Sequence, residues 1–532
     1  MAGSSFTYFP EHRCTGATGI FQDQCVNGQV ITDVNRAFPG DEVYYEAGIE
    51  GITGRITGIK TRRKVHVAGL LLLTSLKKYG KTARGLPVYK MIPLSSTYPP
   101  MYVASSHRDV SQNVYALVEF KEWTAQQKYP HMNLVRILGG QQDPLAENLA
   151  LLHKNEVYRK PLAEDREDRE DREDRMTYPL ACGITCIDPA GSDDLDDAFH
   201  VEGNTVYVHI ADVDYYIRQG DPLDRLLADR VTSIYGPALS HMLPEKYAKD
   251  LISLKPNGRK AAMTVTFTQE NDRLIPIRVN PSFVYPQRAL SYEAAQKRLN
   301  GGDPMLQTVS RLTGQTDTHK IIETLMIACN AYIGDLMAKA GQGLIRTCAA
   351  GSRAQYVPVC PVCPVCPVDQ GSTRHESLNL ENYTHFTSPI RRYADVIVGR
   401  LVKHLTNPRD LPQVSPYAAA DISAACTKIN AYGVKVSRYY RDADIVRLYQ
   451  FVHSKGGLYR TTGVLLAYDA PGIDAELRVG ISEGLDLEYA YPQSLGIPSQ
   501  PLPPLGSTVA IVLRTDSHEI KLKRRVIMHL AV

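Results

Sequence analysis

The chain has 532 residues, of which 43% are hydrophobic and 22% charged, so it is too long for one small domain and has the composition of several globular domains. Ten cysteines in so long a chain exclude a disulfide scaffold, and the N-terminus shows no basic stretch followed by an apolar run, so we expect no secretion signal and a cytoplasmic location. The formal net charge is +3, and without the repeat at 164–175 the chain has 56 basic and 49 acidic residues, a balance that permits a nucleic-acid partner without demanding one.

The first 143 residues consist of short runs of β-forming residues separated by glycine, asparagine and proline. Their spacing predicts two five-stranded OB-like barrels, at 1–63 and 64–143. The longest apolar run, at 68–76, is too short to span a bilayer, and we expect no membrane partner.

A helical segment with a linker is predicted at 144–178. Apolar periodicity indicates a helix over 144–159. Four Glu-Asp-Arg triplets follow at 164–175, and because they offer no apolar face they are typical of a solvated linker or an exposed helix extension.

Residues 179–455 mix strands and helices. Residues 204–217 alternate like a strand, and a helix is predicted from His319 to a stop at Gly341. The apolar face of that helix is Ile322, Leu325, Met326, Cys329, Tyr332, Ile333 and Leu336. Residues 456–532 return to short strands and predict a third small barrel.

A second helix is predicted to begin at Ser388, because serine suits an N-cap and Pro389 suits the first turn. Its buried stripe would be Ile390, Ala394, Ile397 and Leu401. Arg391 and Arg392 would then lie in the first turn, where free backbone N–H groups, the helix dipole and the guanidinium groups together bind an anion. The alternative is that Arg391 only pairs with Asp395 on an exposed helix face.

A tandem Pro-Val-Cys repeat places Cys360, Cys363 and Cys366 at the C-x2-C spacing of zinc sites. Three such ligands do not complete a structural site, and no second pair or nearby histidine pair supplies the rest. The repeat is better explained as a low-complexity insertion.

The highest concentration of candidate catalytic side chains is a cluster of carboxylates in the sequence "CIDPAGSDDLDDAFH". Its members are Asp188, Asp193, Asp194, Asp196 and Asp197. Such crowded carboxylates repel one another unless a cation lies among them, and hard oxygen ligands suit Mg²⁺ or Mn²⁺. An EF-hand does not fit, since its glycine and terminal glutamate are out of place. The alternative is an acidic surface turn, but the cluster leads into an apolar strand, which favours metal binding.

Long segments around these motifs resemble the ribonuclease II / ribonuclease R / Dis3 (RNB) family of 3′→5′ exoribonucleases. The matching segments are "IDPAGSDDLDDAF", "VYVHIADVDYYIRQGDPLDRLLADRVTSIY", "MLPEKYAKDLISLKPNGRKAAMTVTF" and "LENYTHFTSPIRRYADVIVGRL". The organisation is similar to the ribonuclease R-like and Dis3-like-2 branches. The resemblance implies a multidomain α+β protein in which a mixed α/β RNB catalytic domain at 179–455 is flanked by two cold-shock-like barrels, at 1–63 and 64–143, and an S1-like barrel at 456–532.

The resemblance also implies residue roles. Asp188, Asp194, Asp196 and Asp197 match the family's four catalytic, metal-holding aspartates, whereas Asp193 falls where other acids occur. Arg391 matches the arginine that steadies the scissile phosphate, and Arg392 is a neighbouring phosphate contact. Tyr235 and Tyr292 match tyrosines that pack against the last nucleotides.

Three departures from the family stand out. The segment at 348–375 is much shorter than usual and carries the cysteine repeat, and Gly399 stands where the family typically has histidine. The lysine-rich tail of ribonuclease R does not follow the third barrel. The shortened segment bears on the wall of the RNA channel and on processivity, whereas Gly399 implies a packing change.

The expected function is Mg²⁺-dependent (or Mn²⁺-dependent) 3′→5′ hydrolysis of single-stranded RNA to nucleoside 5′-monophosphates, with no obligate protein partner. The 31 tyrosines supply rings that stack on bases, although packing in cores explains most of them as well. The alternatives are a catalytically impaired RNA-binding protein of the same fold and a DNA nuclease.

Overall fold

The protein is described from a computed structural model. The residues that it describes are 17–47, 53–124, 126–159, 175–179, 182–237, 240–271, 273–349, 352–359, 374–406, 415–468, 474–481, 487–494, 504, 507–516, 519–520 and 522–530. The cysteine repeat and all but the last residue of the Glu-Asp-Arg repeat therefore lie outside the described residues.

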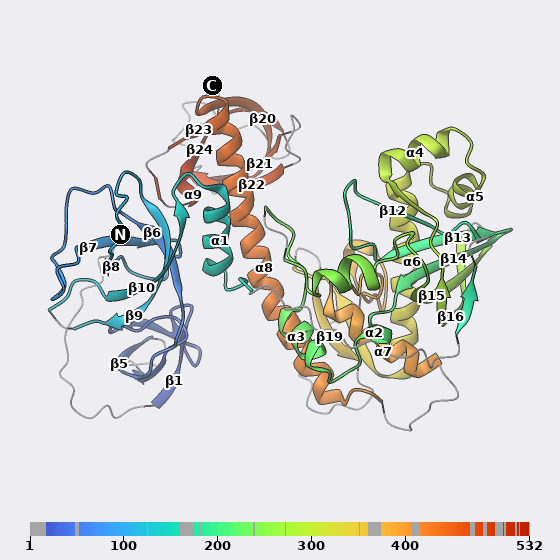
Figure 1. Ribbon diagram of the computed structural model, residues 1–532, viewed down its shortest axis with the longest axis horizontal. Helices are drawn as coiled ribbons and strands as arrows, with labels where there is room; N and C mark the ends of the chain where they lie inside the picture. The colour runs from blue at the N-terminus through green and yellow to red at the C-terminus, as the bar shows by residue number, and fades with distance from the viewer. Residues whose placement is uncertain are drawn as a thin grey trace. The chain divides into compact units, whose positions relative to one another are not determined.

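The chain forms two compact units (Figure 1). One unit consists of Met1–Tyr158 together with Lys435–Val532, and the other is Arg159–Val434. The long helix α8 (Ala419–Ser454) contributes residues to both units.

The first unit contains two closed five-stranded barrels with the same strand order. The strands of the first are β1 (Ala17–Gln22), β2 (Cys25–Val26), β3 (Gln29–Asp33), β4 (Glu42–Ala47) and β5 (Thr53–Thr61). The strands of the second are β6 (Val67–Leu71), β7 (Val88–Pro93), β8 (Met101–Ala104), β9 (Val114–Glu122) and β10 (His131–Gly140). In each barrel the first strand pairs with the fourth and the third pairs in parallel with the fifth, so the sheet closes as in OB folds.

Local sequence explains the boundaries of these elements. Asn27 and Gly28 both have positive φ and form the tight turn between β2 and β3, as an Asn-Gly pair does in a hairpin. The helix predicted over 144–159 is α1 (Pro144–Lys154), which ends before the predicted end. Asp143 caps its N-terminus and proline occupies the first turn.

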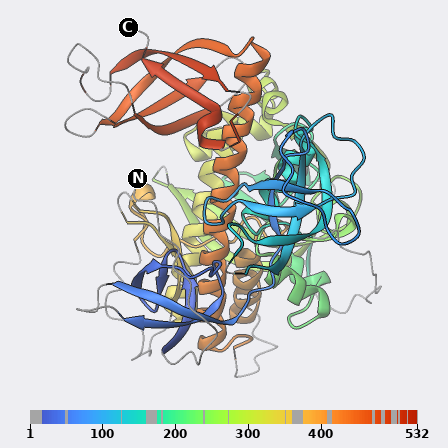
Figure 2. The ribbon, with the colours of Figure 1, turned by 90° about the vertical axis from the view of Figure 1, so that its left-hand side faces the viewer.

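The C-terminal part of this unit is a five-stranded sheet. Its strands are β20 (Leu458–Tyr468), β21 (Asp474–Ile481), β22 (Leu487–Ser494), β23 (Thr508–Thr515) and β24 (Val526–Leu530), with the short helix α9 (Leu522–Arg525) before the last. The order across the sheet is β22-β21-β20-β23-β24. Figure 2 shows this sheet at the C-terminal end of α8.

The second unit is built on a seven-stranded sheet of order β11-β16-β15-β14-β13-β12-β17. Its strands are β11 (Met176–Tyr178), β12 (Thr185–Asp188), β13 (Asp197–Glu202), β14 (Thr205–Ala211), β15 (Lys260–Glu270), β16 (Arg273–Val284) and β17 (Arg288–Ser291). The two outer pairs, β11 with β16 and β12 with β17, are parallel, and the inner strands are antiparallel.

Helices and a small hairpin complete this unit. They are α2 (Val213–Tyr216), α3 (Pro222–Arg230), a π-helical turn (Tyr247–Leu251), α4 (Tyr292–Asn300), α5 (Pro304–Thr313), α6 (Thr318–Ala340), the strands β18 (Gly343–Thr347) and β19 (Gln355–Val359), a 3₁₀ turn (Glu376–Leu378) and α7 (Tyr393–Thr406). Helices α4, α5 and α7 contact the seven-stranded sheet, and one apolar core joins these elements.

The prediction for α6 is confirmed. The helix is capped by Asp317 and ends at Gly341, whose φ of 65° is the left-handed conformation that glycine favours at a helix end. Ile322, Leu325 and Ile333 are buried in the core. By length and composition alone α6 would also cross a membrane, but its apolar side packs within this core, which accounts for its hydropathy.

The predicted start of α7 is wrong. The helix begins at Tyr393, and Ser388 is not its cap. The backbone of Arg391–Tyr393 instead pairs with Val231–Ser233: Ser233 N–H donates to Arg391 O (2.9 Å) and Tyr393 N–H donates to Val231 O (2.8 Å). Because these groups bond to a distant segment, the residues before Tyr393 do not enter the helix.

Candidate active site

The carboxylate cluster lies between two neighbouring strands. Asp188 is the last residue of β12 and Asp197 is the first residue of β13, so the loop between them carries the remaining acids. Ser253 shapes this loop, since its hydroxyl donates to Asp193 O (2.9 Å) and accepts from Leu195 N–H (3.0 Å). The strand ends and the loop together hold the acids at one edge of the core.

Asp196 joins the cluster to the segment that precedes α7. Its Oδ1 accepts from Ile390 N–H at 2.8 Å, and its Oδ2 accepts from Arg391 Nε at 3.1 Å. Arg391 Nη2 donates to Ser388 Oγ at 2.9 Å, so the guanidinium is held at two points. Asp196 is 4% exposed, whereas the Arg391 side chain is 45% exposed and can meet a ligand.

The simple pairing of Arg391 with Asp395 on a helix face is not found. Arg392 makes that contact instead, with Nη2 at 2.7 Å from Asp395 Oδ1, and the same oxygen accepts from Ser388 N–H at 2.8 Å. Asp395 is fully buried, so Arg392 balances an interior charge while Arg391 reaches the acid cluster.

The electrostatics of the cluster favour a bound cation. Burial raises the pKa of Asp196 to about 7, and Arg391 only partly offsets this effect. Burial also raises the pKa of Asp188 and Asp197, and repulsion between neighbouring acids adds to it. Asp188 Oδ2 and Asp197 Oδ2 are buried and have no hydrogen-bond partner among the described residues. An all-oxygen donor set with orphaned carboxylate oxygens fits Mg²⁺ or Mn²⁺.

The two predicted tyrosines lie beside these acids. Tyr235 is 40% exposed, and its hydroxyl donates to Asp194 Oδ2 at 2.5 Å. Tyr292 begins α4, and burial together with the charges of Asp197 and Asp188 raises its pKa to about 12. The Tyr292 ring is stacked on His319, with ring centroids 3.7 Å apart.

The structure separates Asp193 from the other acids. Its side chain is exposed and pairs with Lys255 Nζ at 2.6 Å, which lowers the pKa of this carboxyl. Asp193 therefore already has a cation and serves as a natural control for the cluster.

His241 is a residue at this site that the sequence did not reveal. It is 5% exposed, and its Nδ1 is 3.8 Å from Asp194 Oδ2. Neither ring nitrogen has a hydrogen-bond partner within the described part of the chain, and burial lowers the pKa of the imidazole. His241 directly precedes the family-like segment that begins at Met242, but its closeness to the acids is visible only in the fold.

Comparison with known proteins gives the family. The model of the RNB domain matches residues 181–312 and 350–408, which contain the acid cluster and the arginines. The model of the Dis3-like cold-shock domain 2 matches residues 88–156. Residues 181–312 and 350–408 therefore form an RNB domain.

Relatives cover different shares of the chain. The probable exosome complex exonuclease RRP44 of Caenorhabditis elegans is 24% identical over 79% of this chain and 54% of its own length. The chain spans about half the length of the curated relatives it matches.

Two solved structures share the fold. Mycoplasma genitalium RNase R in complex with ribose-methylated single-stranded RNA has a TM-score of 0.76 and 17% identity, with 94% of this chain and 96% of that chain covered. Yeast Ssd1, a pseudonuclease, has a TM-score of 0.60 and 18% identity, with 90% of this chain and 80% of that chain covered.

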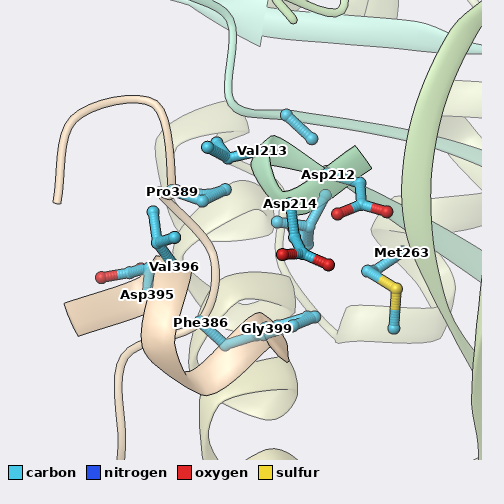
Figure 3. Close-up of a pocket in the computed structure, with 11 residues that line it drawn as sticks. Asp212, Val213, Asp214, Met263, Phe386, Pro389, Asp395, Val396 and Gly399 are labelled. Atoms are coloured by element: carbon cyan, nitrogen blue, oxygen red, sulfur yellow. The ribbon is translucent and has the colours of Figure 1, made fainter. Parts of the chain in front are cut away.

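In the RNB domain, Gly399 opens onto a small pocket (Figure 3). Asp212 and Asp214 lie at α2, and Asp395, Val396 and Gly399 lie on α7. The cavity of about 10 Å³ has room for about one water. A Cβ atom at Gly399 would meet nothing within 4 Å, so this position has room for a small side chain.

A group of aromatic rings lies on the second barrel, and all of these rings except Tyr79 fall in the region that matches the cold-shock model. This "tyrosine surface" consists of Tyr79, Tyr102, Tyr129 and His131 with Lys77, Lys90 and Lys128. Tyr102 is central, with ring centroids 5.0 Å from Tyr79 and 5.5 Å from Tyr129. The rings are half-buried and the lysines lie near them, a combination that suits stacking of bases beside a phosphate backbone.

Proposed function

We propose that the protein is a Mg²⁺-dependent 3′→5′ exoribonuclease that hydrolyses single-stranded RNA to nucleoside 5′-monophosphates. The observation that carries this proposal is the buried acid cluster, with its raised pKa values and orphaned oxygens, tied directly to a half-exposed arginine. RNB relatives with exonuclease names, and an RNase R of the same fold bound to single-stranded RNA, support the same activity.

Asp188, Asp194, Asp196 and Asp197 would hold the ion, for which Mn²⁺ is a substitute. When bound, the ion neutralises charge on the scissile phosphate and lowers the pKa of the attacking water. Arg391 would bind the phosphate. Its Nε is bonded to Asp196 and its Nη2 to Ser388, which hold the guanidinium in place, while much of the side chain stays exposed to a ligand.

The tyrosines would position the terminal nucleotides. The hydroxyl of Tyr235 is fixed on Asp194, which leaves its ring face for a sugar or base near the cut. Tyr292 would offer a ring backed by His319. Arg392 would act on the phosphate only through its positive charge, because its guanidinium is already bonded to Asp395.

The tyrosine surface would bind RNA upstream without reading its sequence, because every base has a face that stacks. We further propose that the barrels at 1–63 and 64–143 are cold-shock-like and that 456–532 is S1-like. The domain boundaries and the cytoplasmic location stay predictions.

The second candidate is an RNA-binding protein without activity, because a pseudonuclease shares this fold. The intact set of four aspartates and Arg391 favours the enzyme.

Purified protein with 5′-labelled single-stranded RNA and Mg²⁺ tests the proposal, beside Asp196→Asn, Asp193→Asn and a matched DNA oligonucleotide. Progressive 3′ shortening of RNA is expected for the wild type and Asp193→Asn, with the rate reduced at least 100-fold in Asp196→Asn and lost in EDTA. RNA that is retained but intact would favour the binding protein, and equal shortening of DNA would favour a DNA nuclease.

A further inference from the structure

A second group of metal-ligand side chains lies away from the acid cluster. Cys182, His200 and Glu202 place one ligand atom each so that all three lie within 4.8 Å of one another. His200 Nε2 is 3.8 Å and Cys182 Sγ is 3.9 Å from Glu202 Oε1. In tetrahedral zinc sites, bonds of about 2.0–2.3 Å separate the ligand atoms by roughly 3.3–3.8 Å. A small movement of the exposed glutamate would close this group around an ion.

His200 supplies an unused donor atom at the centre of this group. Its side chain is fully buried, and Nε2 has no hydrogen-bond partner among the described residues. The ring is fixed between neighbours, since Tyr207 stacks on it with centroids 4.5 Å apart and an interplanar angle of 4°. A buried nitrogen without a partner is costly unless another group completes it.

A hydrogen-bond chain across four strands fixes which nitrogen of His200 carries the proton. His200 Nδ1 lies 2.8 Å from His209 Nε2, His209 Nδ1 lies 2.8 Å from Thr264 Oγ1, and Thr264 Oγ1 lies 2.5 Å from Ser282 Oγ. The Ser282 hydroxyl donates to the Ala262 carbonyl at 3.3 Å, and a carbonyl can only accept.

The direction of every other bond follows from that carbonyl. Ser282 must accept from Thr264, Thr264 must accept from His209, and His209 Nε2 must accept from His200 Nδ1–H. His200 Nε2 is then a bare lone pair directed toward Cys182 and Glu202. This is the arrangement of metal-binding histidines, which donate the other ring N–H to a neighbour.

We infer that Cys182, His200 and Glu202 form a binding site for a divalent transition metal of the zinc class. The mixed sulfur, nitrogen and oxygen set suits Zn²⁺ rather than Mg²⁺. Three protein ligands leave the fourth position to water from the exposed side of Glu202.

The site lies at the far end of the strand pair that carries the acids. Asp188 and Asp197 stand where β12 ends and β13 begins, whereas Cys182 precedes β12 and Glu202 ends β13. β12 and β13 share a single paired position, Thr185 with Phe199. A metal at Cys182, His200 and Glu202 joins the two segments where this ladder is weakest, so its role is structural.

The full chain tests this inference in a background with Cys360, Cys363 and Cys366 replaced by serine, which removes the thiols of the repeat. Metal-free protein is titrated with Zn²⁺ and with Co²⁺, and bound metal is measured by elemental analysis and by thiolate-to-cobalt absorption. With excess Mg²⁺ present to occupy the acid cluster, one equivalent of metal with a thiolate band is expected, together with a rise in melting temperature on Zn²⁺ addition.

Cys182→Ala and Glu202→Gln should lose this metal, the band and the thermal shift, whereas the matched control Cys348→Ala, another half-buried free cysteine, should keep them. Thr264→Val, which breaks the hydrogen-bond chain, should weaken binding about 10–100-fold. Circular dichroism checks that each variant is folded. Cys182→Ala and Glu202→Gln each remove a different ligand at the exposed end of the group, so they test the site independently.

Equal metal content in Cys182→Ala and Cys348→Ala, or no metal in the serine background, would overturn the inference. Asp196→Asn should retain zinc while losing RNA cleavage. Loss of zinc therefore reports on the Cys182, His200 and Glu202 site, and loss of RNA cleavage reports on the acid cluster, so a failure of either proposal can be told from a failure of the other.

Discussion

The acid cluster of the RNB domain and the tyrosine surface of the second barrel differ in their exposure to solvent. Burial raises the pKa values of the carboxylates in the cluster, and the positive charge of Arg391 offsets only part of this rise. The tyrosine surface keeps half-buried rings and lysines in reach of solvent. The proposed chemistry would therefore depend on a desolvated site that requires a cation, whereas the proposed RNA binding would need only accessible rings and charge.

The largest effect is expected when the fixed arginine of the cluster is changed. Arg391→Lys should lower the cleavage rate about 10²–10³-fold, because lysine cannot bond Asp196 and Ser388 while also facing a phosphate. RNA affinity should change little, since the tyrosine surface is intact. Single-turnover rates and equilibrium binding measure the two effects, with Arg298→Lys on exposed α4 as the control. A loss of RNA affinity as large as the loss of cleavage rate would contradict the assignment of cleavage to the acid cluster and of RNA binding to the tyrosine surface.

The next prediction tests the rigidity of the cluster. A Cβ atom at Gly334 of α6 would lie 1.5 Å from the Asn382 carbonyl oxygen, in the segment that leads to Arg391. Gly334→Ala should therefore lower the free energy of unfolding by about 3 kcal/mol, since backbone cannot move aside as a flexible side chain does. Urea unfolding measures the change. A variant as stable as the wild type would show that the packing behind the site is adaptable.

A smaller effect is expected at the tyrosine surface. Tyr79→Ala should weaken RNA binding by about 1–3 kcal/mol, the contribution of one stacked base, while the cleavage rate at saturating RNA stays within about twofold. Tyr79→Phe keeps the ring and is expected to bind as the wild type does. Fluorescence anisotropy with a short single-stranded RNA checks both variants, and weaker binding by the phenylalanine variant would assign the effect to the hydroxyl instead of stacking.

The smallest effect is expected from a helical glycine beside open space. Gly399→Ala on α7 should raise the free energy of unfolding by about 0.5–1 kcal/mol, because the new methyl group meets open space and alanine favours a helix. Cleavage and binding should both stay unchanged. Thermal unfolding beside Gly334→Ala provides the comparison, and destabilisation by Gly399→Ala would mean that the pocket holds a water which the methyl group displaces.

The elements that the sequence predicted correctly are those with local causes. α6 follows from its apolar period, the capping Asp317 and the final Gly341, and α1 follows from Asp143 and Pro144. The acids were visible because five aspartates fall within ten residues. Their grouping and the raised pKa values agree with the expected metal site.

The features that the sequence did not reveal depend on contacts between distant segments. The start of α7 was placed too early because backbone pairing with Val231–Ser233 is invisible in the local pattern. His241 reaches Asp194 only through the fold, and Cys182 is separated from His200 by strands and loops that follow no known ligand spacing. The cysteine repeat, which did have such spacing, lies outside the described residues.

The pairing between Thr232 and Arg391 also dictates an order of events during synthesis. Thr232 Oγ1 donates to Arg391 O at 2.8 Å across 159 positions of the chain. Such a contact closes a long loop, and contacts of this kind form slowly and late in folding. A nascent chain that has emerged only through its acids therefore holds the four aspartates without the arginine that bonds to Asp196. The proposed catalytic arrangement is complete only when the second half of the domain has left the ribosome.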